Sequence, residues 1–477
     1  MGASTWWEQR VSNWLPRGKG AVAASAPPLQ AALQAPAGAA LREPRVPAPI
    51  EPAVLRKVLR PLQAVADSTV SEVEGGRRAR VFAQWYAGAS VAERRQACIL
   101  MSERFAPDPD RIRQAREAYE QAVGTAEEGV AEIRLRKALY SSRTRLLQRF
   151  AVFPEGMRFL VDLRAELLPQ LKSEKRLLAL EAELEGLFST WFDVAFLELR
   201  RISWDSPASL VEKLIQYEAV HDIKSWADVK NRLDSDRRCY GFFHARLPDE
   251  PLIFVEVAFT REIASNIVPL LDETAEAVDL SKATTAIFYS ISNTQTGLKG
   301  ISFGDSLIKR VVETLKADFP QLKTFATLSP IPGFRTWYRK HAARLLEELP
   351  DKHRRTLGRF MGFEPVMPEH IQAWLDQGPH ADAKSPGARW LLHCANRYLG
   401  HELEQGRPVD PVARFHLGNG ARVESIHWLA DPSTKGLQQS YGMMVNYLYD
   451  LKKLDRHRRM LGEGKIPMSG GVADLSL

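Results

Sequence analysis

The stretch LSPIPGF, Leu328 to Phe334, holds a serine at a position where a strand has to end. The run QLKTFATL that leads into it has the apolar and β-branched residues of a strand. Pro330 and Pro332 cannot donate hydrogen bonds to a sheet, and a residue before a proline is pushed towards extended geometry. Ser329 is therefore expected to be held rigidly at the end of a sheet. Its hydroxyl could take part in proton transfer, although residue types alone favour a simple strand cap.

A glycine-containing loop, TGLKGISFG, joins the predicted strand TTAIFYSIS to the predicted helix DSLIKRVVETLKADF. At such a junction the first N–H groups and the dipole of the helix face outward, and glycines let an anion approach the backbone. Lys299, Lys309 and Arg310 would add positive charge for phosphate groups. The loop indicates either a phosphate-binding turn or an ordinary connection, and the surrounding strand order favours phosphate binding.

The same loop contains GISFG, Gly300 to Gly304, which matches the G-x-S-x-G pattern of serine hydrolases. In those enzymes the nucleophile directly follows a buried strand, whereas polar residues at 293–299 separate Ser302 from the strand here. A serine hydrolase or thioesterase that acts on an acyl-CoA through Ser302 is therefore the main rival hypothesis.

Two histidines are candidate partners for a reactive serine. His416 lies in RFHLGNG and His427 in SIHWLA, and the pattern predicts two strands joined by a turn at Gly418–Gly420. A lone histidine in a strand is more often structural than catalytic, and spacing does not choose between these two. No pair among the eleven histidines has the spacing of metal ligands on a helix, so no protein-held metal is expected.

Charge and composition narrow the classes of partner. The chain has 477 residues and a formal charge of +7, with Lys and Arg interleaved with Asp and Glu along almost its whole length. Such diffuse positive charge suits an anionic small molecule better than nucleic acid, which usually requires a concentrated basic stripe. No apolar run approaches the roughly 18 residues of a membrane span. The three cysteines are too far apart for a zinc knuckle or a disulfide framework, so a soluble protein of a reducing compartment is expected.

The elements that position these residues fall into three parts. Residues 1–53 are expected to form a flexible Ala/Pro-rich leader, residues 54–203 an all-helical domain, and residues 204–477 a mixed domain. In the mixed domain, RCYGFFHARL and PLIFVEVAFT are expected to pair as a hairpin with its turn at 248–250. The order hairpin, strand, glycine loop, helix and strand predicts an α+β fold.

Several stretches of the chain together resemble one known family. In chain order they are YEAVHDIKSWADVKNRL, RRCYGFF, AIFYSIS, GLKG, LIKRVV, FATLSPIPGF, FHLGNGA, WLAD and NYLYDL, and they span residues 217–451. The chain resembles the malonyl-CoA decarboxylases, and the helical residues before this span fit the N-terminal domain of that family. It departs from the family in having Ser302 where a glutamate is usual and in lacking the peroxisomal tail of the animal forms, so the role of that side chain and the compartment stay open.

The resemblance implies a catalytic domain with the GNAT (acetyltransferase)-like fold, preceded by a helical domain that serves oligomerisation into a homotetramer. It implies that Ser329 is the catalytic serine, that His416 is its partner and that Tyr449 is an active-site tyrosine, with Ser290 as a weaker candidate. Malonyl-CoA would contact Ser329, His416 and the acyl-CoA loop. The implied members of that loop are Lys299, Gly300, Ile301, Ser302, Phe303, Gly304 and Asp305.

The implied reaction converts malonyl-CoA to acetyl-CoA and carbon dioxide, which controls the malonyl-CoA level in fatty-acid metabolism. The thioester carbonyl accepts the charge as an enolate, so no cofactor is expected. Neither nucleic acid nor a membrane is expected as a partner. A cytoplasmic location is expected, with the mitochondrial matrix as the alternative because residues 1–45 contain few acids. A non-catalytic helical scaffold or nucleic-acid binder is the third hypothesis.

Overall fold

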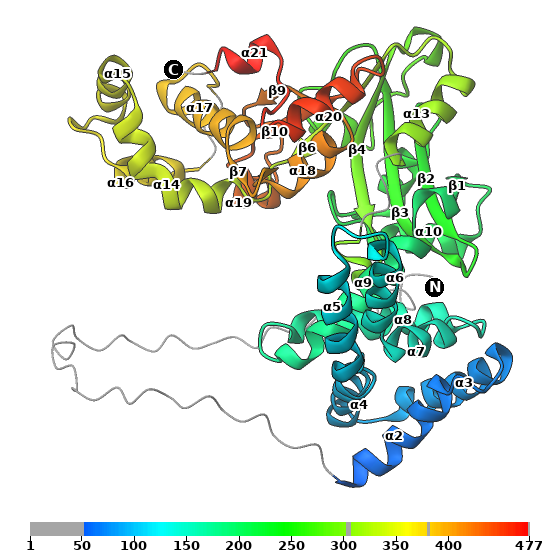
Figure 1. Cartoon of the computed structure of the whole chain (residues 1–477). Coiled ribbons are helices and arrows are strands. Elements are labelled where there is room, and N and C mark those ends of the chain that lie inside the picture. Colours follow the sequence, from blue (N-terminus) through cyan, green and yellow to red (C-terminus); the bar gives the residue numbers. More distant parts are fainter. Residues whose placement is uncertain (1–51, 302–306, 379–381, 476–477) are drawn as a thin grey trace, which may run out of the picture. The chain divides into compact units, whose positions relative to one another are not determined.

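Two kinds of structure follow one another along the chain, helices first and then a mixed sheet with covering helices (Figure 1). The structure is a computed structural model that describes residues 52–301, 307–378 and 382–475. Almost all of the expected leader lies outside these residues. The described helices and strands all belong to one compact unit. The predicted α+β class is confirmed, whereas the division into a helical and a catalytic domain stays a prediction.

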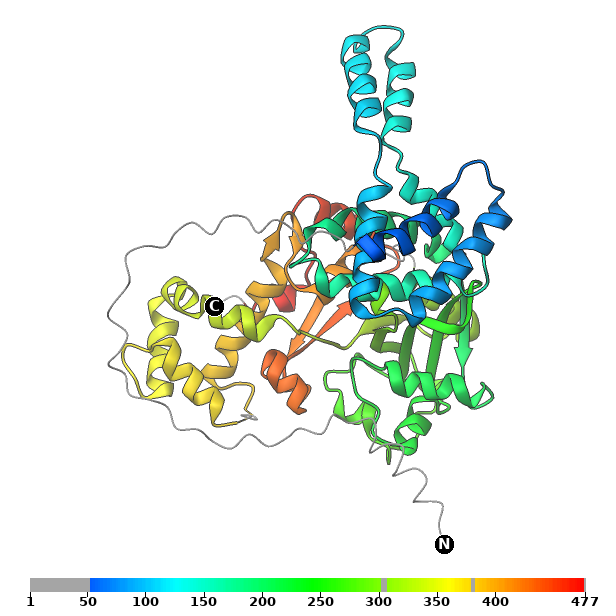
Figure 2. The ribbon, with the colours of Figure 1, turned by 90° about the horizontal axis from the view of Figure 1, so that it is seen from below.

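The first part of the described chain is built from helices. They are α2 (Pro52–Ala66), α3 (Glu72–Gly88), α4 (Val91–Arg104), α5 (Pro109–Ala122), α6 (Glu128–Leu139), α7 (Ser142–Phe150), α8 (Gly156–Leu167) and α9 (Leu178–Trp191). Polar side chains begin several of them; at α4 the Ser90 hydroxyl accepts the Glu93 N–H while the Glu93 carboxylate accepts the Ser90 N–H. Helices α5 and α6 pack against each other as a hairpin that stands away from its neighbours (Figure 2).

The end of the range expected to be helical forms a strand instead. Residues Leu197–Ile202 are β1, which pairs antiparallel with β2 (Arg237–His244). Leu197, Glu198, Leu199 and Arg200 alternate between apolar and charged side chains, which is the period of two of a strand. The pairing with β2 is a long-range contact, so a helical pattern in the preceding residues does not predict it.

The sheet contains antiparallel strands followed by one parallel step. Its further strands are β3 (Leu247–Thr260), β4 (Thr285–Asn293), β5 (Thr324–Thr327), β6 (Ser329–Pro330), β9 (Arg422–His427) and β10 (Met444–Leu448). The order is β1-β2-β3-β4-β5-β10-β6, with β9 also paired to β10. Strands β1 to β4 are antiparallel, and β4 and β5 are parallel because α13 (Leu307–Asp318) crosses between them. The sequence predicted the order hairpin, strand, helix and parallel strand in this mixed sheet, but not the place of β10 between β5 and β6.

The hairpin between β2 and β3 was predicted correctly, but its turn was misplaced. His244 pairs with Leu247, so the turn lies at Ala245–Arg246 and not at 248–250. The residues Pro248, Asp249 and Glu250 belong to β3. The ladder there is irregular, which accommodates a proline near the strand end.

The remaining helices and short strands surround the sheet or extend from it. They are α10 (Ala208–Tyr217), α11 (Trp226–Arg232), α12 (Val268–Leu271), α14 (Phe334–Glu348), α15 (Asp351–Met361), α16 (Pro368–Asp376), α17 (Pro386–Gly400), β7 (Leu403–Glu404), β8 (Arg407–Pro408), α18 (Pro411–Gly418), α19 (Thr434–Ser440), α20 (Leu454–Gly462) and α21 (Gly470–Ala473).

Both faces of the sheet are covered by apolar contacts. On one face Ile287, Ala326, Leu328 and Met444 form a fully buried cluster. On the other face α13 buries its apolar side, and Phe319 just after this helix contacts Phe259 of β3 with ring centroids 4.7 Å apart. The central strands are therefore fixed from both sides, as the continuous burial of β2 also indicates.

The helical part of the chain holds the start of the glycine loop. The Arg164 guanidinium on α8 donates to the carbonyl oxygens of Gly297 and Lys299 at 2.7 and 2.9 Å and to the Glu181 carboxylate at 2.7 Å. Gly297 belongs to the single turn η5 (Thr296–Leu298), and it lies so close to α8 that a Cβ there would be 1.9 Å from the Val161 carbonyl oxygen. Only glycine allows this approach.

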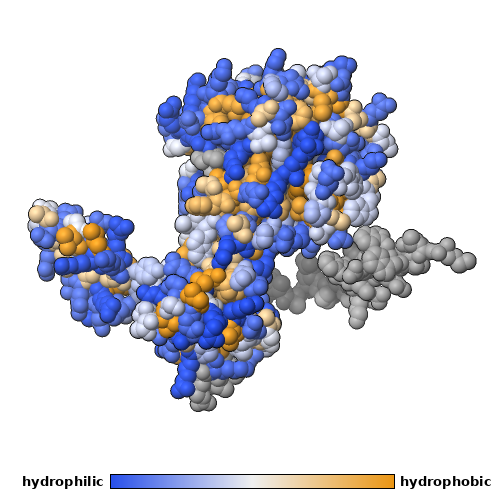
Figure 3. Space-filling model, turned by 90° about the vertical axis from the view of Figure 1, so that its right-hand side faces the viewer, coloured by the Kyte–Doolittle hydropathy of each residue, from blue (hydrophilic) through white to orange (hydrophobic). Residues whose placement is uncertain are grey.

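Hydrophilic residues cover most of the face of the molecule shown in Figure 3, with hydrophobic residues in patches between them. Within the described ranges, no helix is both long and apolar enough to cross a membrane.

We predict that Gly297→Ala lowers the free energy of unfolding by about 2 kcal/mol or more, because the new Cβ must displace the α8 backbone. Urea unfolding of purified protein measures this change. The matched control is Gly186→Ala on α9, where a Cβ would meet nothing within 4 Å and should stabilise the exposed helix slightly. Equal effects of the two substitutions would contradict the close approach at Gly297.

Candidate active site

The site begins where two parallel strands part. Strands β4 and β5 pair only from Thr285/Thr324 to Phe288/Thr327, and the last ladder hydrogen bond runs from the Leu328 N–H to the Phe288 carbonyl at 3.0 Å. Beyond it β4 continues to Asn293, while the other strand crosses to β10, where Ser329 is opposite Val445. Separated carboxyl ends of parallel strands are a common place for a ligand to bind.

Ser329 lies at this divergence and is held by two neighbours. Its hydroxyl donates to the Thr327 hydroxyl oxygen at 2.8 Å, and it is 3.4 Å from His416 Nε2. Thr327 is held in turn, because its hydroxyl oxygen accepts the Tyr447 N–H at 3.1 Å. The serine is therefore rigidly placed, as Pro330 led us to expect.

His416 lies on a helix and not on the predicted strand. Residues Pro411–Gly418 form α18, and the Asp410 carboxylate caps it by accepting the N–H groups of Val412 and Ala413, both at 2.9 Å. An aspartate before a proline is a strong helix-start signal, which the strand prediction overlooked. Gly420, at φ +86°, ends this helix and does not form the turn of a hairpin.

Tyr449 and Tyr447 fix the imidazole of His416. The Tyr449 hydroxyl is 2.7 Å from His416 Nδ1, and the Tyr447 ring stacks on the imidazole with centroids 4.7 Å apart. Tyr449 follows β10 directly and Tyr447 lies within it, so the strand that pairs with Ser329 also holds both tyrosines. A continuous chain of contacts thus runs from Tyr449 through His416 and Ser329 to Thr327.

Burial keeps this group of side chains uncharged. His416 is 3% exposed, and the loss of solvation lowers its pKa from 6.5 to about 3. Burial also raises the pKa of Tyr449 far above its usual value. Both groups are therefore neutral near pH 7, and Tyr449 keeps its hydroxyl proton for a hydrogen bond.

The other candidate residues lie elsewhere. His427 is on β9, where its Nε2 contacts the Asn446 amide oxygen and is 3.0 Å from the Ser425 hydroxyl. Ser290 lies on β4 and donates to the Glu218 carboxylate at 2.8 Å. Among the described residues, no three His, Cys, Asp or Glu side chains gather as a metal site.

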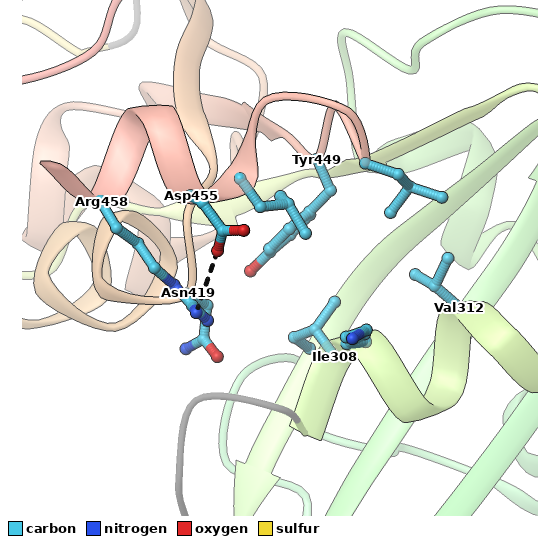
Figure 4. A pocket seen from close by; sticks show the side chains of 9 residues that line it. Ile308, Val312, Asn419, Tyr449, Asp455 and Arg458 are labelled. Atoms are coloured by element: carbon cyan, nitrogen blue, oxygen red, sulfur yellow. Dashed lines mark ion pairs between the residues drawn. The ribbon is translucent and has the colours of Figure 1, made fainter. Parts of the chain in front are cut away.

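A cavity of about 150 Å³ reaches Tyr449 from the side of α13 and α20 (Figure 4). Figure 4 shows Tyr449 and Asn419 on one side of this space and Ile308 and Val312 of α13 on the other. The lining residues are Ile308, Lys309, Val312, Asn419, Tyr449, Leu451, Leu454, Asp455 and Arg458. The cavity is therefore mixed in character, with four aliphatic side chains beside the polar Asn419 and Tyr449 and the charged groups of α13 and α20.

Part of the predicted acyl-CoA loop is described. Gly300 has a φ of +83° and open space around its Cα, and Ile301 is buried. The backbone oxygen of Lys299 is held by Arg164. The predicted binding residues Ser302, Phe303, Gly304 and Asp305 lie outside the described residues.

Comparison with known families identifies the protein family of this chain. The model of the malonyl-CoA decarboxylase C-terminal domain matches residues 195–476, and that of the N-terminal domain matches residues 105–192. The chain belongs to the malonyl-CoA decarboxylase family. The resemblance predicted from the sequence is therefore confirmed, and a serine hydrolase at Ser302 is not favoured.

Members of the malonyl-CoA decarboxylase family from distant organisms match most of the chain. The mitochondrial malonyl-CoA decarboxylase of Mus musculus is 35% identical over 424 residues, which are 84% of this chain and 85% of that protein. The one from Anser anser anser is 35% identical over 405 residues, or 79% and 78% of the two chains. The crystal structures from Rhodopseudomonas palustris and Agrobacterium vitis are 39% and 40% identical, with TM-scores of 0.76. Each alignment covers 88% of this chain and 99% or 100% of the other.

Three residues of this malonyl-CoA decarboxylase family member lie at the candidate site although its sequence did not predict them there. Thr327 lies two residues before Ser329, so the period of two in a strand could have placed both hydroxyls on one face. Tyr447 lies two residues before Tyr449, so the same period of two could have placed both tyrosines on one face. Asn419 gave no local signal, because its place beside the cavity depends on α20 and α13.

We predict that burial of neutral His416 makes stability fall on acidification. Below about pH 6.5 the unfolded chain binds a proton at this histidine while the native chain, with a pKa of about 3, does not, so stability is lost as pH falls through this window. Urea unfolding at pH 7.5 and 5.0 should show a loss that is greater by roughly 2 kcal/mol in wild type than in His416→Asn. Equal losses in the two proteins would contradict a neutral buried His416.

Proposed function

We propose that this chain decarboxylates malonyl-CoA to acetyl-CoA and carbon dioxide. The observation that carries the proposal is the chain of contacts from Tyr449 to Ser329, placed beside a cavity in a member of the malonyl-CoA decarboxylase family. The crystal structures from Rhodopseudomonas palustris and Agrobacterium vitis carry the name malonyl-CoA decarboxylase and align over nearly their whole length.

The reaction needs an acceptor for charge and a source for one proton. When the bond between the carboxylate and the methylene carbon breaks, its electron pair moves into the thioester carbonyl and forms an enolate, so the substrate itself serves as the electron sink. Hydrogen-bond donors that hold the enolate oxygen stabilise the transition state by roughly 3 kcal/mol each. Pro330 has no N–H, so the donor is not the backbone of the residue after Ser329.

Ser329, His416 and Tyr449 deliver the proton. The Ser329 hydroxyl protonates the enolate carbon, and the His416 Nε2–H passes a proton to the serine oxygen. As Nε2 loses its proton, the Tyr449 hydroxyl passes its own to Nδ1, so the imidazole stays neutral and Tyr449 regains a proton from solvent. Tyr449 donates to Nδ1, which favours the tautomer with its proton on Nε2. Because His416 is neutral in its buried position, the proton comes finally from solvent, and the cavity beside Tyr449 offers solvent a route. One proton is consumed for each carbon dioxide released.

The phosphate groups of the substrate are bound by the positive end of α13. The predicted acyl-CoA loop, from Lys299 to Asp305, precedes this helix in the sequence, and the first N–H groups and the dipole of the helix favour an anion. Lys309 on the first turn of α13 and Arg458 on α20 add charge at the cavity. Arg164 supports this loop from α8, so the helical part of the chain contributes to binding without contact with substrate.

We also propose a homotetramer that works in fatty-acid metabolism, in the cytoplasm or, alternatively, in the mitochondrial matrix. Exposed apolar side chains on the α5–α6 hairpin, among them Val123 and Ile133, support association through residues 54–203. The relatives from mouse and goose are named mitochondrial, which supports the alternative compartment. Light scattering of the purified chain distinguishes a tetramer from a monomer, and cell fractionation distinguishes the two locations.

The proposed activity is tested by incubating the purified chain with malonyl-CoA in D2O, without added cofactor or metal, and following the products by mass spectrometry. We expect acetyl-CoA to appear in step with carbon dioxide, with one deuterium in its methyl group beyond any exchanged into unreacted malonyl-CoA. Free CoA with intact malonate would instead indicate the hydrolase, and no reaction would contradict both hypotheses.

Ser329→Ala and His416→Asn should each lower kcat by about 10² or more, because each breaks the path of the proton. The affinity for the product acetyl-CoA should change little. Ser425→Ala is a matched control, since Ser425 also contacts a histidine, His427, at 3.0 Å on a neighbouring strand. Near-normal turnover in either site variant would overturn the assigned proton path.

A further inference from the structure

Asn419 carries a buried polar atom that lacks a partner. The side chain follows α18 directly and is 7% exposed. Its amide nitrogen donates to the Phe415 carbonyl oxygen at 2.7 Å, whereas its amide oxygen has no hydrogen-bond partner among the described residues. A buried acceptor left unpaired usually costs about 1–3 kcal/mol, so such an atom calls for an explanation.

The orientation of this amide is determined by its surroundings. Rotating it by half a turn would place the amide oxygen against the Phe415 carbonyl oxygen and bring two acceptors together, so the nitrogen must face Phe415. The oxygen is then the atom that remains for the cavity that Asn419 lines together with Tyr449 and Ile308 (Figure 4). A ligand that packs closely against this wall of the cavity would meet a hydrogen-bond acceptor.

The partner of an acceptor must be a donor, which restricts the part of the substrate that can lie there. The malonyl end of malonyl-CoA offers only carbonyl and carboxylate oxygens, which the Asn419 oxygen would repel. The nearest donor to the thioester is the amide N–H of the pantetheine arm, two methylene groups from the sulfur. The apolar residues Ile308, Val312, Leu451 and Leu454 along the cavity suit these methylene groups.

We propose that the Asn419 amide oxygen accepts a hydrogen bond from the cysteamine amide N–H of the substrate's pantetheine arm. This contact sets how far the thioester reaches past Tyr449 towards His416 and Ser329. Asn419 is three residues after His416 at the end of the same helix. One helix end therefore carries both a residue of the proton path and the residue that positions the acyl group. The proposal rests on the proposed function, because it takes malonyl-CoA as the substrate.

A chemical double-mutant cycle tests this contact. Wild type and Asn419→Leu are each assayed with malonyl-CoA and with an analogue in which an ester oxygen replaces the cysteamine amide N–H. We expect wild type to lose roughly 10-fold or more in kcat/KM with the analogue, because the Asn419 oxygen is left unpaired, and the variant to be nearly insensitive to the exchange. The same fold-loss in both proteins would overturn the proposal and would mean that water alone satisfies Asn419.

Two further variants keep the result interpretable. Asn419→Asp retains an acceptor oxygen, so it should remain sensitive to the ester exchange even if the lost bond to Phe415 lowers its overall activity. Asn231→Leu is the matched control, because it removes an amide that donates to the Leu270 carbonyl at 3.3 Å on α11, outside the residues that line the cavity. It should show the sensitivity of wild type.

The affinities of the same proteins for acetyl-CoA and its ester analogue, measured by calorimetry, separate the two proposals. Wild type that binds the acetyl thioesters with the expected preference for the amide, but does not decarboxylate malonyl-CoA, would contradict the proposed function and leave the Asn419 contact supported. Wild type that decarboxylates malonyl-CoA while the cycle shows no coupling would contradict the Asn419 contact alone.

Discussion

The end of the parallel ladder between β4 and β5 is the constraint on which the site depends. After the bond from Leu328 to Phe288 the two strands separate, and Pro330, which has no N–H, prevents the ladder from being resumed in full. Ser329 is transferred to β10, and that strand brings Tyr447 and leads to Tyr449. The same break therefore brings together the residues of the candidate site.

Burial keeps the histidine and tyrosine of the candidate site uncharged. Removing His416 from water lowers its pKa to about 3, so the imidazole exchanges hydrogen bonds as a neutral group and does not carry a standing charge. The stacked Tyr447 ring, the Tyr449 hydroxyl and the Thr327 hydroxyl hold this group in one arrangement. An enolate is basic enough to take a proton from neutral donors of this kind.

Side-chain hydrogen bonds join the helical part of the chain to the start of the glycine loop. Arg164 is itself almost fully buried, and its guanidinium links Glu181 of α9 to the backbone of the loop at Gly297 and Lys299. A buried charge of this kind is tolerated only when its hydrogen bonds are nearly all satisfied, which gives the loop a defined start. Changes in the helices can therefore reach the start of this loop through Arg164.

The sequence by itself determined the features that depend on neighbouring residues: the α+β class, the helix α13, the end of a strand just before Ser329, and motifs specific enough to indicate the family. Local pattern was wrong where a cap competed with an apolar run, as at Asp410 before α18, and where β1 joined a distant strand. Local spacing did not separate His416 from His427, although the family resemblance implied His416; the tertiary structure placed His416 beside Ser329 and brought Thr327, Tyr447 and Asn419 to the site. The physical reason is that these contacts join segments up to 120 residues apart, as between Thr327 and Tyr447, and strand pairing and helix packing over such distances leave no trace in local spacing.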